Sequence, residues 1–242
     1  MRRLGIAAAL LAVLSLILVW EIHRDAGKLL DLPGIVEDRL PPSPVETIPA
    51  SQRAAADWIV IGAREEVKKG TRYDASYQVI SYPGGDVSPD RGACTDVVIR
   101  ALRWAGLDLQ QLIHEDMAEN FALYPQNWGL TGPDPNIDHR RVPNQMTFFQ
   151  RHGLSLTCQV EDHLDEWQWG DIVYWRFDNG EEHCGVISDR KNPSGRPLVI
   201  HNAGIAVEED CLERWEIIGH FRYPVLWDSN ILANSSTKFG SN

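Results

Sequence analysis

The sequence predicts a mixed α+β domain in which helices from the N-terminal half pack on an antiparallel sheet from the C-terminal half. Two observations lead to this prediction. Helical patterns occupy residues 51–152, and short strand-like runs joined by turns follow Gly153. Helices followed by consecutive strands are typical of α+β domains, whereas parallel sheets require the two element types to alternate.

Four helices are expected in the first half of the domain. Ser51 is a candidate N-cap for a helix that runs to Lys69 and ends at Gly70. The others begin near Ala93, Asp108 and Pro143. Glycine, proline and aspartate are dense between residues 83 and 92, which indicates a long exposed loop before the second helix.

The strand-like runs are rich in β-branched and aromatic residues and are bounded by turn residues. They cover residues 154–160, 171–177, 184–188, 197–201 and 219–222. The short connections between them favour antiparallel neighbours in one sheet.

Residues 1–24 contain an apolar run that follows two arginines. The run ends in bulky residues, with no small residues where a signal peptidase would cut. We therefore expect a single-pass anchor in the inner membrane, with the arginines in the cytoplasm and the domain in the periplasm. The alternative is a cleaved signal peptide and a protein secreted to the periplasm.

The remaining boundaries follow from composition. Proline-rich residues 25–50 predict a linker, residues 51–227 the folded domain, and polar residues 228–242 a flexible tail. A net charge of −11 argues against binding to nucleic acid. The cysteine spacings match no zinc motif, so we expect neither a metal nor a cofactor. The disulfide pairing of Cys158, Cys184 and Cys211 stays open.

Three residues are candidates for catalysis. Cys94 follows the turn-rich loop and opens a helix, where unpaired amides and the helix dipole favour a thiolate. His183 precedes one strand-like run and His201 ends the next. Taken singly, each has an ordinary structural explanation, as an inert buried thiol or a polar residue at a strand end.

Taken in order, Cys94, His183 and His201 resemble the catalytic residues of the NlpC-type cysteine peptidases, which are papain-like bacterial cell-wall amidases. Residues 82–87, 90–96, 135–141 and 219–223 look more closely like a bacterial family of unknown function placed near that group. Two positions depart from the NlpC pattern. Ala-Cys-Thr-Asp replaces the usual Asp-Cys-Ser-Gly around the nucleophile, and Cys184 stands where valine or isoleucine is usual.

The resemblance implies a papain-like, NlpC-type core and a Cys-His-His triad. Cys94 would be the nucleophile, His183 its base, and His201 the residue that orients the base. The implied activity is that of a cysteine amidase or peptidase, and the implied substrate is a peptide derived from peptidoglycan.

Four further residues are candidates for substrate binding. Tyr82 is considered as a second oxyanion donor, and Asp96 as a neighbour of the nucleophile. Arg140 and Arg141 are considered as a clamp for a substrate carboxylate. The structural alternative for the arginine pair is a staple between loops through buried carboxylates such as Asp86 or Asp90.

Other functional classes stay open at this point. A papain-like fold also supports acyl transfer. A non-catalytic envelope module that binds cell-wall peptides is a second alternative. A zinc site is a third, because one cysteine and two histidines are suitable ligands if they converge.

Overall fold

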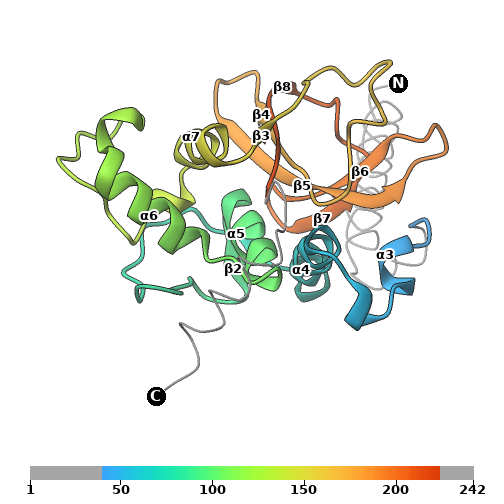
Figure 1. The fold of residues 1–242 in the computed structure, drawn as a ribbon, viewed down its shortest axis with the longest axis horizontal. Helices are drawn as coiled ribbons and strands as arrows, with labels where there is room; N and C mark the ends of the chain where they lie inside the picture. Colours follow the sequence, from blue (N-terminus) through green and yellow to red (C-terminus); the bar gives the residue numbers. More distant parts are fainter. Residues whose placement is uncertain (1–39, 224–242) are drawn as a thin grey trace, which may run out of the picture. The chain divides into compact units, whose positions relative to one another are not determined.

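A computed structural model describes residues 40–223 of the protein. In this part of the chain, helices pack against a six-stranded antiparallel sheet (Figure 1). The prediction of a mixed α+β domain with an antiparallel sheet is confirmed. The predicted membrane helix of residues 1–24 and the tail of residues 228–242 lie outside the described residues. No helix within residues 40–223 is both long enough and apolar enough to cross a membrane.

The helices largely follow the predicted pattern. They are α3 (Pro44–Thr47), α4 (Ala55–Lys69), α5 (Cys94–Trp104), α6 (Leu109–Asn120) and α7 (Val142–His152), with the 3-10 turns η1 (Ala50–Gln52), η2 (Phe121–Leu123) and η3 (Asp138–Arg140). Helix α4 ends at Gly70, which adopts the left-handed conformation as its position predicts. Its start differs from the prediction, because Ser51 lies in η1 and the Ala54 amide donates to Asp57 instead.

The sheet has the order β3-β8-β4-β5-β6-β7. Its strands are β3 (Leu154–Ser155), β4 (Ile172–Arg176), β5 (Glu182–Lys191), β6 (Pro197–Asn202), β7 (Ala206–Glu209) and β8 (Glu216–Arg222). The predicted run of residues 154–160 pairs only over its first two residues. Strand β7 is absent from the predicted set, because its two adjacent glutamates give no run of apolar or alternating residues.

A separate parallel pair joins β1 (Arg72–Tyr73) to β2 (Arg91–Gly92). The register places Tyr73 beside Gly92, two residues before Cys94. This short pair therefore brings the segment after α4 to the start of α5.

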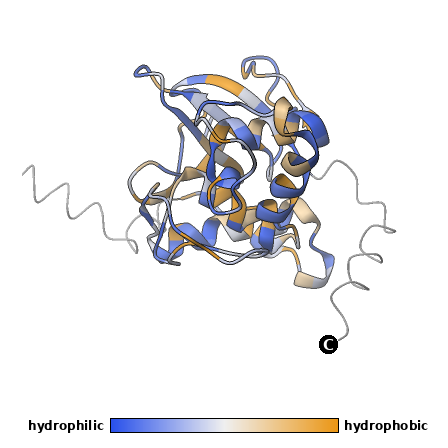
Figure 2. Ribbon diagram, turned by 90° about the vertical axis from the view of Figure 1, so that its left-hand side faces the viewer, coloured by the Kyte–Doolittle hydropathy of each residue, from blue (hydrophilic) through white to orange (hydrophobic). Residues whose placement is uncertain are grey.

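Both faces of the sheet are covered. Helices α4, α5 and α7 pack on one face, where Leu102 and Phe149 join Tyr174 and Val186 in a single apolar cluster. On the other face, a second cluster surrounds Trp175. In Figure 2 the helices carry hydrophobic residues on one side and hydrophilic residues on the other, as expected for helices that cover a sheet.

The folded unit begins before the predicted boundary at Ser51. Val45 is fully buried, and its amide donates to the Asp189 carboxylate over 2.8 Å. The Ser43 hydroxyl donates to the same carboxylate over 2.6 Å and accepts from Arg64 over 3.0 Å. Residues 43–47 therefore belong to the domain and not to the linker, and Pro44 starts a helix, where its missing amide hydrogen costs nothing.

Replacement of Ser43 by alanine tests this boundary. Ser43→Ala removes a hydroxyl that serves two buried charged groups, so it should lower the free energy of unfolding by about 1–3 kcal/mol. Thr47→Ala is the control, because its exposed hydroxyl bonds only to the Pro44 carbonyl; it should change stability by less than about 0.5 kcal/mol. Urea unfolding of the full chain measures both, and equal effects would contradict the packing of this segment.

Candidate active site

Cys94 is the first residue of α5, and its position is set by the turn before the helix. The Asp96 carboxylate accepts from the Ala93 amide over 2.6 Å and so caps the helix. Gly92 is required here, because a Cβ at this position would lie 2.8 Å from the Cβ of Asp96. Cys94 itself is 4% exposed, with its backbone amide at the N-terminus of the helix.

The surroundings of Cys94 favour its thiolate. The Cys184 thiol donates to the Cys94 sulfur, and this contact has the largest effect in holding the pKa of Cys94 well below its usual range. A hydrogen bond and the charge of His183 act in the same direction, whereas burial opposes them. Burial and the Cys94 sulfur raise the pKa of Cys184, so Cys184 stays protonated and able to donate.

His183 lies on β5 within an aromatic setting. Its ring stacks on Trp175 at 5.7 Å between centroids, and Phe177 and Trp215 pack around it. Its Nε2 lies 2.9 Å from Nδ1 of His201, which leaves Nδ1 of His183 as the nitrogen that can face Cys94. The structure therefore brings the three predicted catalytic residues together, since Cys94 and His183 line one cleft and His183 is bonded to His201.

His201 continues these contacts away from Cys94. Its Nε2 lies 3.0 Å from Oε1 of Glu209, and Glu209 in turn accepts from Arg214 over 2.5 and 2.9 Å. The contact with His201 is the largest cause of a lowered pKa of Glu209, to about 2. Burial lowers the pKa of His201. Glu209 was not predicted as a site residue, and no local pattern indicates it.

Cys94 and His183 open onto a cleft of about 710 Å³, which we call the Cys94 cleft. The other cleft residues that bear on function are polar or aromatic: Tyr73, Trp128, Arg141, Glu181 and Glu182. A cleft of this size takes a small ligand or a short stretch of peptide.

Tyr73, and not Tyr82, is the tyrosine near the nucleophile. Tyr82 does not line the Cys94 cleft, and its ring packs edge-on against His114 at 4.8 Å between centroids. Tyr73 lines the cleft, and burial together with the charge of Cys94 raises the pKa of its hydroxyl to about 12. The hydroxyl is therefore a hydrogen-bond donor at neutral pH. Only the pairing of β1 with β2 reveals this position.

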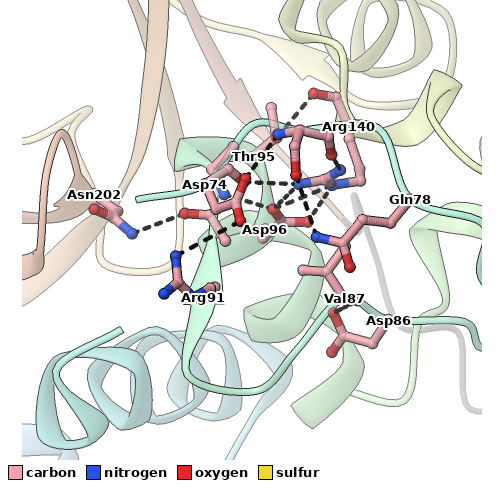
Figure 3. Close-up of polar contacts among 12 residues, drawn as sticks. Asp74, Gln78, Asp86, Val87, Arg91, Thr95, Asp96, Arg140 and Asn202 are labelled. Carbon is pink, nitrogen blue, oxygen red and sulfur yellow. Dashed lines mark hydrogen bonds and ion pairs between the residues drawn. The ribbon is translucent and has the colours of Figure 1, made fainter. Parts of the chain in front are cut away.

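Asp96 and Arg140 form a buried ion pair (Figure 3). The Arg140 guanidinium donates to both carboxylate oxygens of Asp96 over 2.9–3.2 Å, and to the carbonyls of Ser76 and Asp74 over 2.8 and 3.0 Å. Arg140 lines the Cys94 cleft, but all three of its guanidinium nitrogens are engaged by these partners; Asp96 does not line the cleft. Arg140 therefore joins loops through a buried carboxylate, which was the structural alternative for the arginine pair. The carboxylate is that of Asp96, and not that of Asp86 or Asp90.

Arg141 is arranged differently from Arg140. It lines the Cys94 cleft, lies 3.9 Å above the ring centre of Trp128, and donates to Asp138 over 2.8 Å. One carboxylate partner leaves further donors of its guanidinium available. Arg141 therefore stays a candidate for carboxylate binding.

The donors near the triad do not form a ready metal site. His183 and His201 contact each other through ring nitrogens. His201, Glu209 and Cys211 lie within 4.8 Å of one another, but Glu209 is engaged by Arg214, and burial raises the pKa of Cys211 to about 12. A thiol must lose its proton to bind zinc. We assign no metal to these residues.

Comparison with known proteins places the chain in a family. Residues 60–223 match the family described as Domain of unknown function (DUF1287). The chain belongs to this family. It is also 48% identical over 216 residues to the protein described as Uncharacterized protein YijF of Escherichia coli (strain K12). The matched region covers 89% of this chain and 98% of that protein. No solved structure matches the chain.

The structural role of Arg140 is testable by stability. Arg140→Met leaves the Asp96 carboxylate buried without its partner, so it should lower the free energy of unfolding by roughly 3–5 kcal/mol. Adding Asp96→Asn should recover part of this loss, because the unpaired charge is then removed. Arg151→Met is the control, since it breaks an ion pair nearer the surface; it should cost less than about 1 kcal/mol. If Arg140→Met left the free energy of unfolding in urea unchanged, Arg140 would again be a candidate for substrate binding.

The contact between Cys184 and Cys94 predicts a pH effect. Cys184→Val removes the thiol that donates to Cys94, and it should raise the pKa of Cys94. The pH midpoint for alkylation of Cys94 by iodoacetamide should move upward to match, and the rate at pH 6 should fall. Cys211→Val, in the cluster on the other face of the sheet, should leave the midpoint unchanged. Mass spectrometry of the Cys94 peptide measures the rate, and an unmoved midpoint in Cys184→Val would contradict the role of the Cys184 thiol.

Proposed function

We propose that the protein is a cysteine amidase or peptidase with an NlpC-type, papain-like core. The observation that carries this proposal is the arrangement of Cys94 at the start of α5. His183 lines the same cleft as Cys94 and lowers its pKa, and one ring nitrogen of His183 lies 2.9 Å from His201. A nucleophile, an adjacent base and a third group that orients the base make up the arrangement used for acyl transfer.

The proposed reaction begins when His183 takes the proton of the Cys94 thiol. The resulting thiolate attacks a substrate carbonyl and forms a tetrahedral intermediate. The Cys94 amide at the helix start and the Tyr73 hydroxyl are the two donors for its oxyanion. His183 then protonates the leaving amine as the carbon–nitrogen bond breaks, which gives a thioester. Water, deprotonated by His183, attacks the thioester and releases the acid and the free thiol.

The substrate class that fits the cleft is a peptide carrying both acidic and basic groups. Arg141 on Trp128 offers a site for a carboxylate, and Glu181 and Glu182 offer sites for an amine. Peptidoglycan stem peptides have both kinds of group, and they are the substrate we propose. No nucleic acid and no cofactor enter the proposed reaction.

The proposed location is the periplasmic side of the inner membrane. The apolar run in residues 1–24 would anchor the chain, and Arg2 and Arg3 would stay in the cytoplasm. Secretion to the periplasm after signal cleavage is the alternative. In either case the domain would face the cell wall.

Digestion of purified peptidoglycan tests the proposal. The protein should release fragments whose masses show one hydrolysed amide bond per cut, and Cys94→Ser and His183→Ala should abolish release. Cys158→Ser is the control, because this exposed cysteine lies outside the Cys94 cleft and its loss should leave activity intact.

The products also separate the alternatives. An acyltransferase would give fragments joined to an added amine in place of water. A module that only binds cell-wall peptides would retain peptidoglycan without cutting it, and its Cys94 would react no faster than an ordinary thiol. Either result would overturn hydrolysis as the function.

A further inference from the structure

Four side chains form a continuous line of polar contacts that begins beside the nucleophile. His183, which lines the same cleft as Cys94, lies 2.9 Å from His201, His201 lies 3.0 Å from Glu209, and Glu209 binds both outer nitrogens of Arg214. The register of β6 and β7 explains the contact between His201 and Glu209. His201 pairs with Val207, and so Glu209 is its diagonal neighbour on the same face.

The direction of each proton in this line follows from Glu209. Glu209 is ionised at neutral pH and can only accept, so Nε2 of His201 carries a hydrogen and donates. The buried His201 ring is neutral, since burial lowers its pKa, and its Nδ1 is then an acceptor. Nε2 of His183 must therefore carry the hydrogen in the contact between the two rings. When the His183 ring is neutral, its Nδ1 is therefore left without a proton and can take one from Cys94.

We propose that Glu209 is a positioning residue that sets the tautomers of both histidines and so keeps the base nitrogen of His183 available to Cys94. This inference rests on the proposed function of Cys94 as a nucleophile. It adds a fourth residue to the triad, one that touches neither the substrate nor the reacting sulfur.

Loss of the carboxylate would remove this control. His201 could then carry its hydrogen on Nδ1 and donate it to Nε2 of His183. His183 would in turn hold its own hydrogen on Nδ1, toward Cys94, where it could no longer accept a proton. The Glu209 carboxylate lies beyond His201 as seen from His183. When His183 becomes an imidazolium, this negative charge stabilises it through the intervening ring.

Arg214 and Trp215 hold Glu209 and the two rings in this order. Arg214 binds the two oxygens of Glu209 and lies 5.2 Å from the ring centre of Trp215. Trp215 packs edge-on against both His183 and His201. The adjacent residues 214 and 215 therefore hold the carboxylate and the imidazoles together.

Nitrogen NMR of the histidine rings tests the inference on the unaltered full chain. In the wild-type protein His183 and His201 should both be protonated at Nε2 in their neutral forms. Glu209→Gln should shift His201 toward a mixture of the two tautomers, because an amide can donate as well as accept. A wild-type His201 protonated at Nδ1 would overturn the inference, whether or not any variant folds.

Reactivity gives the second measurement. Glu209→Gln should slow alkylation of Cys94 at pH 7 by roughly ten- to a hundredfold, since a wrong tautomer costs a catalytic triad at least that much. Glu213→Gln is the matched control, because it replaces a nearby glutamate that pairs with Arg196 outside the line; it should leave the rate unchanged.

The two proposals fail in different ways. If wild-type Cys94 is alkylated no faster than an ordinary thiol, the proposed nucleophile is wrong regardless of Glu209. If wild-type Cys94 is activated but Glu209→Gln changes neither its rate nor the tautomer of His201, the role assigned to Glu209 is wrong and the proposed enzyme remains.

Discussion

The buried ion pair of Asp96 and Arg140 determines the geometry of the site. Asp96 caps the helix that begins with Cys94, and Arg140 ties that cap to the carbonyls of Asp74 and Ser76. Neither charge can leave without exposing the other to an apolar interior, which is strongly unfavourable. The helix start, the segment that follows Tyr73, and the turn η3 are therefore held in one arrangement. A charged pair that looks suited to binding substrate instead positions the groups that face the cleft.

Strand alternation explains how one sheet supplies groups to two different environments. Adjacent residues of a strand point to opposite faces. His183 joins the aromatic residues on one face of β5, while Cys184 belongs to the apolar cluster on the face covered by the helices. Strand β7 repeats the pattern with two carboxylates, since Glu208 binds the buried Arg64 and Glu209 binds His201. Both members of the first pair lower the pKa of Cys94, so two chemically different neighbours act on one sulfur.

The part of the site that could be predicted has local signals. Cys94 stands where a turn-rich loop becomes a helix, and His183 and His201 stand at the ends of strand-like runs. Tyr73 and Glu209 have no such signal, because they reach the site through pairing of β1 with β2 and of β6 with β7. Tyr82 is the opposite case, a residue that is near the site in sequence but does not line the cleft. It precedes the same loop in sequence, yet its ring packs on His114 away from the cleft.

The fold was likewise predictable where the signals in the sequence are local, and not elsewhere. Apolar spacing and glycine stops were sufficient for four helices, and β-branched runs were sufficient for β4, β5, β6 and β8. The start of the domain was missed, because the prolines near residue 44 resemble a linker. Their role depends on Asp189, a residue about 145 positions later that no local pattern connects to them.

The distance along the chain between Cys94 and its partners has a consequence for biosynthesis. His183 and Cys184 are made about ninety residues after the nucleophile, and Glu209 later still. Until those strands have formed, neither the Cys184 thiol nor His183 can lower the pKa of Cys94. Contacts between residues so far apart in sequence also slow folding. The low pKa of Cys94 is thus a property of the complete domain and not of the helix that carries this residue.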